Sequence, residues 1–388
     1  MPFDFLAPIH EDIIASSANL PEQALGRKIH LHSPSLGMPD LEGIKIALIG
    51  VMENRGAKNE EAADFDFNTI RSAFHGLFPG NWNMKIADLG DIKPGASLED
   101  TYFVVQTVVS ELLKRKIIPV ILGGSQDLAY PQYRAYDGFS KMINFVNIDA
   151  RFDLGDAEQG FDNTSHVSKM ILEQPYNLFN YSNIGYQTYF NSQEEIDLVE
   201  KLYFDAYRLG EVSAQIDLVE PTMRDADMVN VDILSLSSSS LLEENHLSPN
   251  GFDGKEICRL ARYAGISDKV SSFGIYELHR LFPQPSSAML VAQIIWYFIE
   301  GVNYRKNEHT IFKKNQFKKY QVPVSDEVLT FYKSDLSERW WIEIPFYPSV
   351  NNKLKKHTLL PCTHQDYLEA CNQEIPERWH KARRKNEI

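Results

Sequence analysis

Four segments of the chain place polar side chains directly after short apolar runs. They are Gly123-Gly124-Ser125-Gln126-Asp127, Asp149-Ala150-Arg151-Phe152-Asp153, Asn230-Val231-Asp232 and the single residue Glu277. If the apolar runs are parallel strands, these segments lie at the carboxyl edge of one sheet, where open α/β sheets bind ligands. One strand-end aspartate is more often a helix cap or a loop anchor, but four such ends on one rim are a specific signal. The pattern predicts a functional site built around carboxylates.

The stretches between these polar ends alternate between strand and helix patterns. Apolar runs predict strands at 44–51, 85–89, 117–122, 142–148, 178–185, 228–231 and 270–276. Helical spacing predicts helices over 68–77, 98–115, 196–209, 255–264 and 286–301. This alternation implies a three-layer α/β/α fold with a mainly parallel sheet. We expect residues 1–42 to form an arm, 43–310 the α/β core, and 311–388 an extension packed on the core.

The four polar segments, in this order, resemble the ureohydrolase family of arginase, agmatinase and formimidoylglutamase. That family carries Gly-Gly-Asp-His, Asp-Ala-His-x-Asp, Asp-x-Asp and a late Glu, each at a strand end. The resemblance covers roughly residues 43–305 and extends to a loop ending in His166 and a turn at Pro249-Asn250-Gly251-Phe252. It implies the arginase-like fold.

The resemblance also implies six ligand positions for two Mn²⁺ ions, and three of the six have changed. By family precedent one ion lies at Gln126, Asp149, Asp153 and Asn230, and the other at Arg151, Asp149, Asn230 and Asp232. Gln126 and Arg151 stand where the family has His, and Asn230 stands where it has Asp. Each ion therefore loses two of its four protein ligands.

The chemistry of these replacements weakens metal binding. A guanidinium has donors only and stays protonated, so Arg151 cannot be a metal ligand. The amide oxygens of Gln126 and Asn230 are uncharged and suit at best a hard ion such as Mg²⁺ or Ca²⁺. We expect Arg151 to take the place of one ion by pairing with Asp149 or Asp232, with a protonated His166 or raised carboxylate pKa values absorbing the remaining charge. No cofactor is expected; the alternative is one weakly bound Mn, Mg or Ca ion.

Two residues match family positions that contact the substrate and not the metal ions. Glu277 aligns with the acidic residue that holds the cationic end of the substrate, and His166 with the loop histidine that carries protons. The competing interpretations are a salt bridge from Glu277 to Arg151 or Arg280, and a loop histidine without a partner. The hydroxyls of Ser235 and residues 237–240 could cap a helix or receive an anion, with capping favoured.

Loss of the paired ions removes the activated water on which the family's reaction depends. We therefore predict a catalytically degenerate ureohydrolase that binds a protein partner or a small cationic ligand, with Glu277 and Arg151 as ligand-binding positions. The alternative is a formimidoylglutamase-like or other amidine hydrolase with an atypical metal site. A third possibility is a structural subunit, because the resemblance implies a homo-oligomer. Four aromatic residues could anchor a partner or simply pack on the core: Trp340, Trp341, Phe346 and Tyr347.

The composition of the chain excludes some classes of partner and indicates a cellular compartment. The net charge of −14 leaves no basic face for a nucleic acid or an anionic membrane, and the basic runs at 353–356 and 381–385 are predicted to belong to a solvated tail. The three cysteines share no metal-type spacing, so inert thiols in a reducing compartment are expected. The N-terminus lacks the pattern of a secretory signal, and the apolar stretch 288–299 is too short to span a bilayer. These features predict a cytoplasmic protein.

Overall fold

The computed structural model of the chain describes residues 2–58, 60, 64–155, 160–241, 248–281, 284–308, 317–345 and 359–387. Its main sheet contains ten strands among these residues, in the order β1-β4-β3-β5-β10-β9-β6-β7-β8, with β2 also paired to β4. The strands are β1 (Leu6–Ala7), β2 (His30–Leu31), β3 (Ile44–Val51), β4 (Lys85–Ile92), β5 (Ile118–Gly123), β6 (Ile143–Ile148), β7 (Leu178–Tyr186), β8 (Asp205–Arg208), β9 (Met228–Asp232) and β10 (Ser272–Tyr276). In the described part of this sheet the pairing of β1 with β4 is antiparallel, and the other pairings are parallel.

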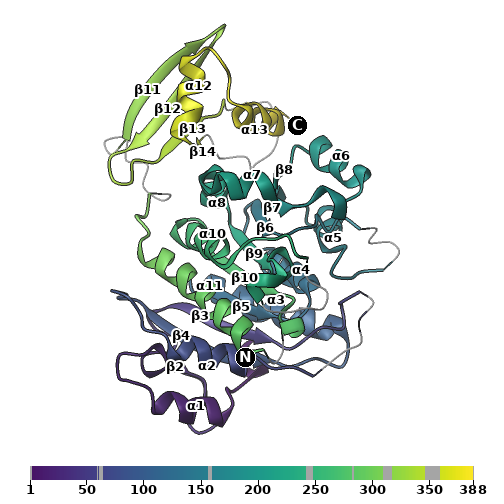
Figure 1. The fold of residues 1–388 in the computed structure, drawn as a ribbon, viewed down its shortest axis with the longest axis vertical. Helices are drawn as coiled ribbons and strands as arrows, with labels where there is room; N and C mark the ends of the chain where they lie inside the picture. Colours follow the sequence, from purple (N-terminus) through teal and green to yellow (C-terminus); the bar gives the residue numbers. More distant parts are fainter. Residues whose placement is uncertain are drawn as a thin grey trace.

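Helices cover both faces of the sheet, as Figure 1 shows. They are α1 (Glu11–Ala18), α2 (Asn68–Gly76), α3 (Leu98–Lys114), α4 (Ala129–Arg134), α5 (His166–Leu172), α6 (Gln193–Lys201), α7 (Leu209–Ala214), α8 (Glu220–Asp225), α9 (Ser238–Leu241), α10 (Gly254–Ile266) and α11 (Pro285–Asn303). Alternate residues of β3 separate onto the two faces: Ile46 and Leu48 pack in the cluster that includes α2, α10 and α11, whereas Ala47 and Ile49 pack in the cluster that includes α3 and α4. The predicted three-layer α/β/α fold is confirmed.

Local sequence signals account for several helix starts. The Ser97 side chain accepts a hydrogen bond from the backbone N–H of Asp100, and the Asp100 carboxylate accepts one from the backbone N–H of Ser97, so the helix begins at Leu98 as predicted. The predicted helix over 196–209 is wrong in its second half. Helix α6 ends at Lys201, Tyr203 has a positive φ of 55°, and the chain then forms β8 beside β7. A four-residue strand is too short for apolar periodicity to separate it from a helix end.

The chain before residue 43 adds β1 and β2 to the sheet edge, and the chain after residue 316 forms a second sheet. That sheet is antiparallel, in the order β11 (Phe317–Val324), β12 (Glu327–Ser334), β13 (Trp340–Glu343) and β14 (Leu359–Cys362). It packs with α12 (His364–Cys371) and α13 (Glu377–Glu387) around an apolar cluster of its own. Both extensions are present; the boundaries at 42/43 and 310/311 stay predictions.

The C-terminal extension is held to the core by a buried arginine of α8. The Arg224 guanidinium donates to the carbonyl oxygens of Trp340 and Cys362 at 3.1 and 3.0 Å and lies over the Trp341 ring.

Trp340 and Trp341 are buried, so packing is the correct interpretation for both, while Phe346 and Tyr347 lie outside the described residues. Residues 381–385 belong to the packed helix α13 and not to a solvated tail, a correction to the prediction. The run 353–356 also lies outside the described residues.

None of the helices in the described ranges combines the length and apolarity needed to cross a membrane.

Candidate functional site

The sheet order brings the four predicted polar ends together. Strands β5, β10, β9 and β6 are neighbours in that order. Their registers pair Leu122 with Ile275, Tyr276 with Asp232, and Val231 with Ile148, so the four strands end at nearly the same level. This rim therefore carries Gln126, Asp149, Asp232 and Glu277 as predicted, and all four side chains are buried.

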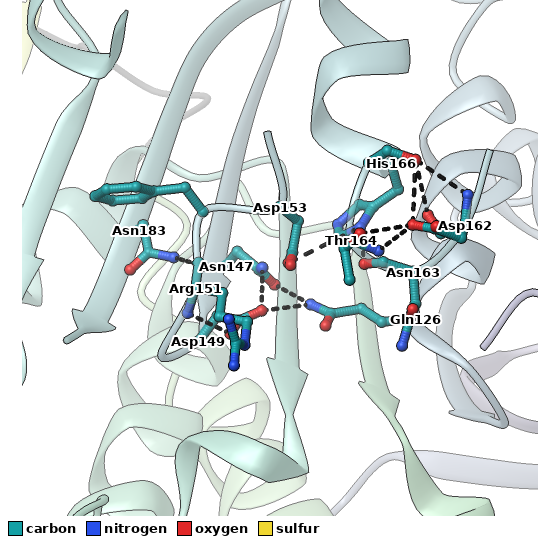
Figure 2. Close-up of polar contacts among 12 residues, drawn as sticks. Gln126, Asn147, Asp149, Arg151, Asp153, Asp162, Asn163, Thr164, His166 and Asn183 are labelled. Carbon is teal, nitrogen blue, oxygen red and sulfur yellow. Dashed lines mark hydrogen bonds and ion pairs between the residues drawn. The ribbon is translucent and has the colours of Figure 1, made fainter. Parts of the chain in front are cut away.

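Asp149 receives hydrogen bonds from three directions at this rim (Figure 2). Its Oδ2 accepts from Gln126 Nε2 and Asn147 Nδ2, both at 2.9 Å, and its Oδ1 accepts from the backbone N–H of Arg151 at 2.8 Å. Gln126 thus acts here as a hydrogen-bond donor to a carboxylate. Asn147 was not predicted, although it lies two residues before Asp149 on β6 and so projects from the same face of the strand.

Asp153 and Asp232 complete a group of three buried carboxylates. Burial raises the pKa of Asp153 well above its ordinary value, and the negative charges of Asp149 and Asp232 raise it further. Burial and the charge of Asp149 likewise raise the pKa of Asp232 well above its ordinary value. The pKa of Asp149 is also raised by burial, against the lowering effect of its hydrogen bonds. Each carboxylate is therefore costly to ionise as long as no cation is near.

Arg151 does not occupy the place that we predicted for it. Its side chain is exposed. Nη1 donates to the carbonyl oxygen of Phe190 at 3.0 Å, and the guanidinium lies 4.7 Å from the centroid of the Phe190 ring. Among the described residues it forms no ion pair within 4.0 Å with Asp149 or Asp232. The expectation that Arg151 replaces a metal ion by such a pair is wrong, because the long side chain reaches the loop after β7.

Several buried polar atoms near the carboxylates have no partner in the part of the chain that the structure describes. They are Asp153 Oδ2, His166 Nε2, and both Oδ1 and Nδ2 of Asn230. Buried polar atoms nearly always form hydrogen bonds with protein, water or a ligand. The atoms of this cluster are therefore able to bind a ligand. No set of three or more His, Cys, Asp or Glu side chains among these residues is already arranged around a metal position.

His166 is a buried residue at the start of α5 and not a loop histidine without a partner. Its Nδ1 lies 3.0 Å from the carbonyl oxygen of Asn163 and 3.9 Å from a carboxylate oxygen of Asp153. Because a carbonyl can only accept, Nδ1 carries the proton and Nε2 is a free acceptor. Burial lowers the pKa of His166 to about 4, so the residue is neutral near pH 7 and does not supply the positive charge that we had considered.

Glu277 is fully enclosed by partners of its own. Its Oε1 accepts from the backbone N–H of Gln126 and from Asn163 Nδ2, both at 2.9 Å, and its Oε2 pairs with Arg280 Nε at 2.7 Å. Arg280 also pairs with Glu60. The predicted salt bridge to Arg280 is confirmed, whereas the described residues show none between Glu277 and Arg151. A cationic ligand would have to displace Arg280 to reach Glu277.

Removal of Arg280 tests this arrangement. We expect Arg280→Ala to lower the free energy of unfolding by about 2–3 kcal/mol, because the carboxylate of Glu277 stays buried without its cation. Added methylguanidine should raise the Tm of this variant by binding in the vacated position and should leave the Tm of the wild type unchanged. Thermal unfolding with and without millimolar methylguanidine measures both effects. An equal response of the two proteins would show that Glu277 does not hold the guanidinium.

The structure also contains a cavity of about 540 Å³, whose lining includes none of the rim carboxylates. Loops that follow β7, β8 and β9 line it, together with the turn at residues 249–251. Ser237 and Ser239 lie in its wall, and the Ser237 hydroxyl is 3.1 Å from that of Ser239 and 2.8 Å from that of Ser240. Ser235, in contrast, donates to the backbone carbonyl of Asp232. The Ser235 hydroxyl therefore satisfies a backbone carbonyl, whereas Ser237 and Ser239 belong to the cavity wall.

Comparison with known proteins identifies the family to which this architecture is similar. The model of the arginase family matches residues 44–300. A formimidoylglutamase of Staphylococcus epidermidis is 28% identical over 266 residues, which cover 64% of this chain and 84% of that protein. A formimidoylglutamase of Streptococcus gordonii is 24% identical over 295 residues, covering 70% and 88%.

Solved structures agree with this architecture at the level of the fold. Trypanosoma cruzi formiminoglutamase, crystallised with Mn²⁺, superposes with a TM-score of 0.61 at 19% identity and covers 69% of this chain and 96% of that one. The formimidoylglutamase of Bacillus subtilis gives a TM-score of 0.60 at 18% identity, with coverage of 69% and 90%. At these identities the likeness concerns the fold.

Proposed function

The chain belongs to the arginase family, and from that premise we propose that it hydrolyses the C–N bond of a linear amidine with the help of a single hard divalent cation. One observation carries the proposal. The buried carboxylates of Asp149, Asp153 and Asp232 share one rim, and Asp153 and Asn230 keep atoms there that have no partner among the described residues. The names of the curated relatives, formimidoylglutamases, support an amidine of the formimidoyl type as substrate.

Among the described residues no three or more His, Cys, Asp or Glu side chains are already arranged around a metal position, so a bound ion would have to draw the carboxylates together. Three carboxylates would carry a charge of −3 in a buried place, and hard oxygen donors of this kind suit Mn²⁺, Mg²⁺ or Ca²⁺. Asp149, Asp153 and Asp232 would hold the ion, and the unpartnered amide of Asn230 lies on the neighbouring strand. The Arg151 guanidinium is exposed and contacts Phe190, so it does not fill the place of an ion, although its charge still acts to lower the pKa of Asp149 and Asp153. A bound divalent ion would supply Lewis-acid activation of water or of the amidine.

The chain's own side chains would then position the reactants. Gln126 and Asn147 fix the orientation of the Asp149 carboxylate. The free Nε2 of His166 can accept a proton from water as the water oxygen bonds to the amidine carbon. When the C–N bond breaks, that proton can pass to the leaving nitrogen. Burial of the whole rim excludes bulk water, which strengthens each of these electrostatic effects.

The competing function is a degenerate ureohydrolase that binds a partner or a cationic ligand without catalysis. Two observations favour it: Glu277 is occupied by Arg280, and the described His, Cys, Asp and Glu side chains do not form a ready metal site. It stays a prediction, as do the homo-oligomer and the cytoplasmic location. We favour the hydrolase because the guanidinium of Arg151, which could have paired with the carboxylates in place of a cation, bonds to Phe190 instead and forms no ion pair with Asp149 or Asp232 among the described residues.

A direct assay separates the two functions. The purified protein, stripped with EDTA and reloaded with Mn²⁺, should release the amine product from formimidoylglutamate, and the stripped protein should not. Release that is equal with and without the ion would contradict the role of the cation. No release under either condition, from folded protein, would favour the degenerate function.

Restoring the family's ligands offers a second test of how many ions are bound. We expect the variant with Gln126→His, Arg151→His and Asn230→Asp to bind two Mn²⁺ per chain where the wild type binds one, because each replacement supplies a better ligand at a position implied by the family. Equilibrium dialysis with Mn²⁺ measures both numbers. Equal numbers for the two proteins would mean that these three positions do not control the second ion.

A further inference from the structure

A smaller cavity, of about 70 Å³, lies where the C-terminal extension meets the core (Figure 1). It is lined mainly by the first halves of β6 and β7, by β8, by α8 and by one face of α13. We propose that this cavity binds a phosphate dianion and that Arg378, Lys381 and Lys385 of α13 hold it. The inference is independent of the proposed function, because the carboxylates of Asp149 and Asp153 follow the opposite end of β6.

Helix α13 presents three cations to the cavity. Arg378, Lys381 and Lys385 are three and four residues apart, so they lie on one face of the helix, and all three line the cavity. The helix is attached on both sides: Trp379 Nε1 donates to the carbonyl oxygen of Glu343 at 2.9 Å, and Lys385 Nζ donates to Asn180 Oδ1 of β7. The family model ends at residue 300, so these cations lie outside the matched part of the chain.

Two of the cations keep donors for a ligand. Arg378 Nε donates to Asp366 Oδ1 at 3.0 Å and Nη1 donates to the carbonyl oxygen of Pro361 at 3.4 Å, and within the described ranges Nη2 has no acceptor. Lys381 lies 3.0 Å from Glu377, whose side chain is 81% exposed, and such a surface pair is weak. An ammonium group has three donors, so Lys381 can bind a further oxygen.

The two aspartates of the opposite wall are already engaged. Asp225 pairs at 3.0 Å with Lys269, which lies outside the lining. Asp205 Oδ2 accepts from Asn180 Nδ2 at 2.8 Å and from the Ser182 hydroxyl at 3.2 Å. The three cations of α13 therefore face carboxylates whose charge is already partly balanced by other groups.

The electrostatics of Lys385 indicate that the cavity lacks negative charge. Burial lowers the pKa of Lys385 to about 8 with a contribution from Lys381, although Asp205 and Asp225 act in the opposite direction. A dianion beside Lys385 would favour its charged form.

The size of the cavity suits a small oxyanion. One buried water needs about 10–15 Å³ of such volume, so the cavity has room for about five atoms of this size, which matches the heavy atoms of phosphate. The four oxygens of phosphate can accept from all three cations at once, whereas a carboxylate has only two oxygens. Phosphate therefore fits both the charge and the volume of the cavity.

Binding of inorganic phosphate to the full-length protein tests this site. Isothermal titration calorimetry at constant ionic strength should show one saturable phosphate per chain. EDTA in the buffer removes any metal ion at the carboxylate rim that could bind phosphate instead. Lys381→Gln should weaken binding by about tenfold, since one charge-assisted hydrogen bond is lost. The double variant Lys381→Gln/Lys385→Gln should weaken it further, and its Tm shows whether it is folded; if it is not, the single variant decides.

Two controls place the binding in this cavity. Lys318→Gln removes an exposed lysine of the extension that is not in the lining, and Arg208→Gln removes the arginine that lines the 540 Å³ cavity. Both should bind phosphate like the wild type. Absence of saturable binding at about 10 mM phosphate, or binding that Lys381→Gln leaves unchanged, would overturn the assignment. Phosphate binding by a protein that hydrolyses no amidine would leave this site intact and contradict only the proposed function.

Discussion

Asp153→Asn should strongly weaken cation binding and hydrolysis and at the same time make the metal-free protein more stable. Asp153 is buried, its Oδ2 has no partner among the described residues, and it lies beside Asp149 and Asp232. Its backbone has a positive φ of 54°, a conformation that Asn tolerates well, so the substitution removes charge with little backbone strain. The effects on function and on stability therefore have opposite signs.

The expected magnitudes are large enough to measure separately. Loss of a charged ligand should weaken Mn²⁺ binding by about 100-fold or more and hydrolysis by about 10²- to 10⁴-fold. In EDTA the free energy of unfolding at pH 7 should rise by about 1–2 kcal/mol, because a group whose pKa is raised by burial no longer has to ionise in the folded state. Urea unfolding in EDTA and Mn²⁺ titration provide the two readouts. A variant that is less stable without metal would contradict this account of the carboxylates.

Arg71→Met should produce the largest loss of stability among the predictions made here. Arg71 is completely buried, and it pairs with Asp88 and Asp91, each at 2.9 Å. His75 lies 3.8 Å from Asp88 on the same side of the sheet. Removing the guanidinium leaves the buried carboxylate of Asp88 and the half-buried carboxylate of Asp91 without their cation, which typically costs about 3–5 kcal/mol. Arg115→Gln, in an exposed pair with Glu111, should change stability by less than about 0.5 kcal/mol.

The loss of stability caused by Arg71→Met should become smaller as the pH falls. The charge of Arg71, together with its hydrogen bonds and His75, outweighs burial and holds the pKa of Asp88 at about 2, below its ordinary value. The stabilising contribution of Asp88 is therefore complete above about pH 4 and is lost as the pH falls toward 2. The pKa of Asp91 is raised because burial and the charge of Asp88 outweigh Arg71 there. Urea unfolding of both proteins between pH 2 and 7 should show the difference shrinking at the acid end. A constant difference would contradict the assignment to Asp88.

The fold was predictable because its signals are local. Apolar runs such as Ile44–Val51 and the capping box at Ser97 fix single elements, and the alternation of elements then fixes the layers. Strand β8 was not predicted because its three half-buried residues and one exposed residue give no detectable apolar period. The second sheet was not predicted because buried and exposed residues are mixed along its two eight-residue strands, β11 and β12, so no continuous apolar run marks either of them.

The positions of the site residues were predictable, but the directions of their long side chains were not. Strand ends placed Asp149, Asp232 and Glu277 on one rim because backbone register determines where they lie. Arg151 was assigned to the metal position from its place in a motif, yet its side chain can reach Phe190, where a carbonyl and an aromatic ring receive the guanidinium. The pairing of Arg280 with Glu277 carried only a weak signal, a spacing of three residues.

This difference changes how the lost ligands should be interpreted. The strongest argument for an empty site was an ion pair of Arg151 with the carboxylates, but the guanidinium lies exposed against Phe190, where its charge only partly offsets the raised pKa values of Asp149 and Asp153. What remains at the rim is a set of three carboxylates and a neutral amide, which is a reduced oxygen-donor site.

The number of ions bound per chain tests the central claim most directly. The wild-type protein should be incubated with excess Mn²⁺, passed over a desalting column and analysed by inductively coupled plasma mass spectrometry, with Asp153→Asn treated in parallel. A single-cation hydrolase predicts close to one Mn²⁺ per wild-type chain and close to none in the variant. A value near zero in the wild type, or a value near two, would contradict the claim.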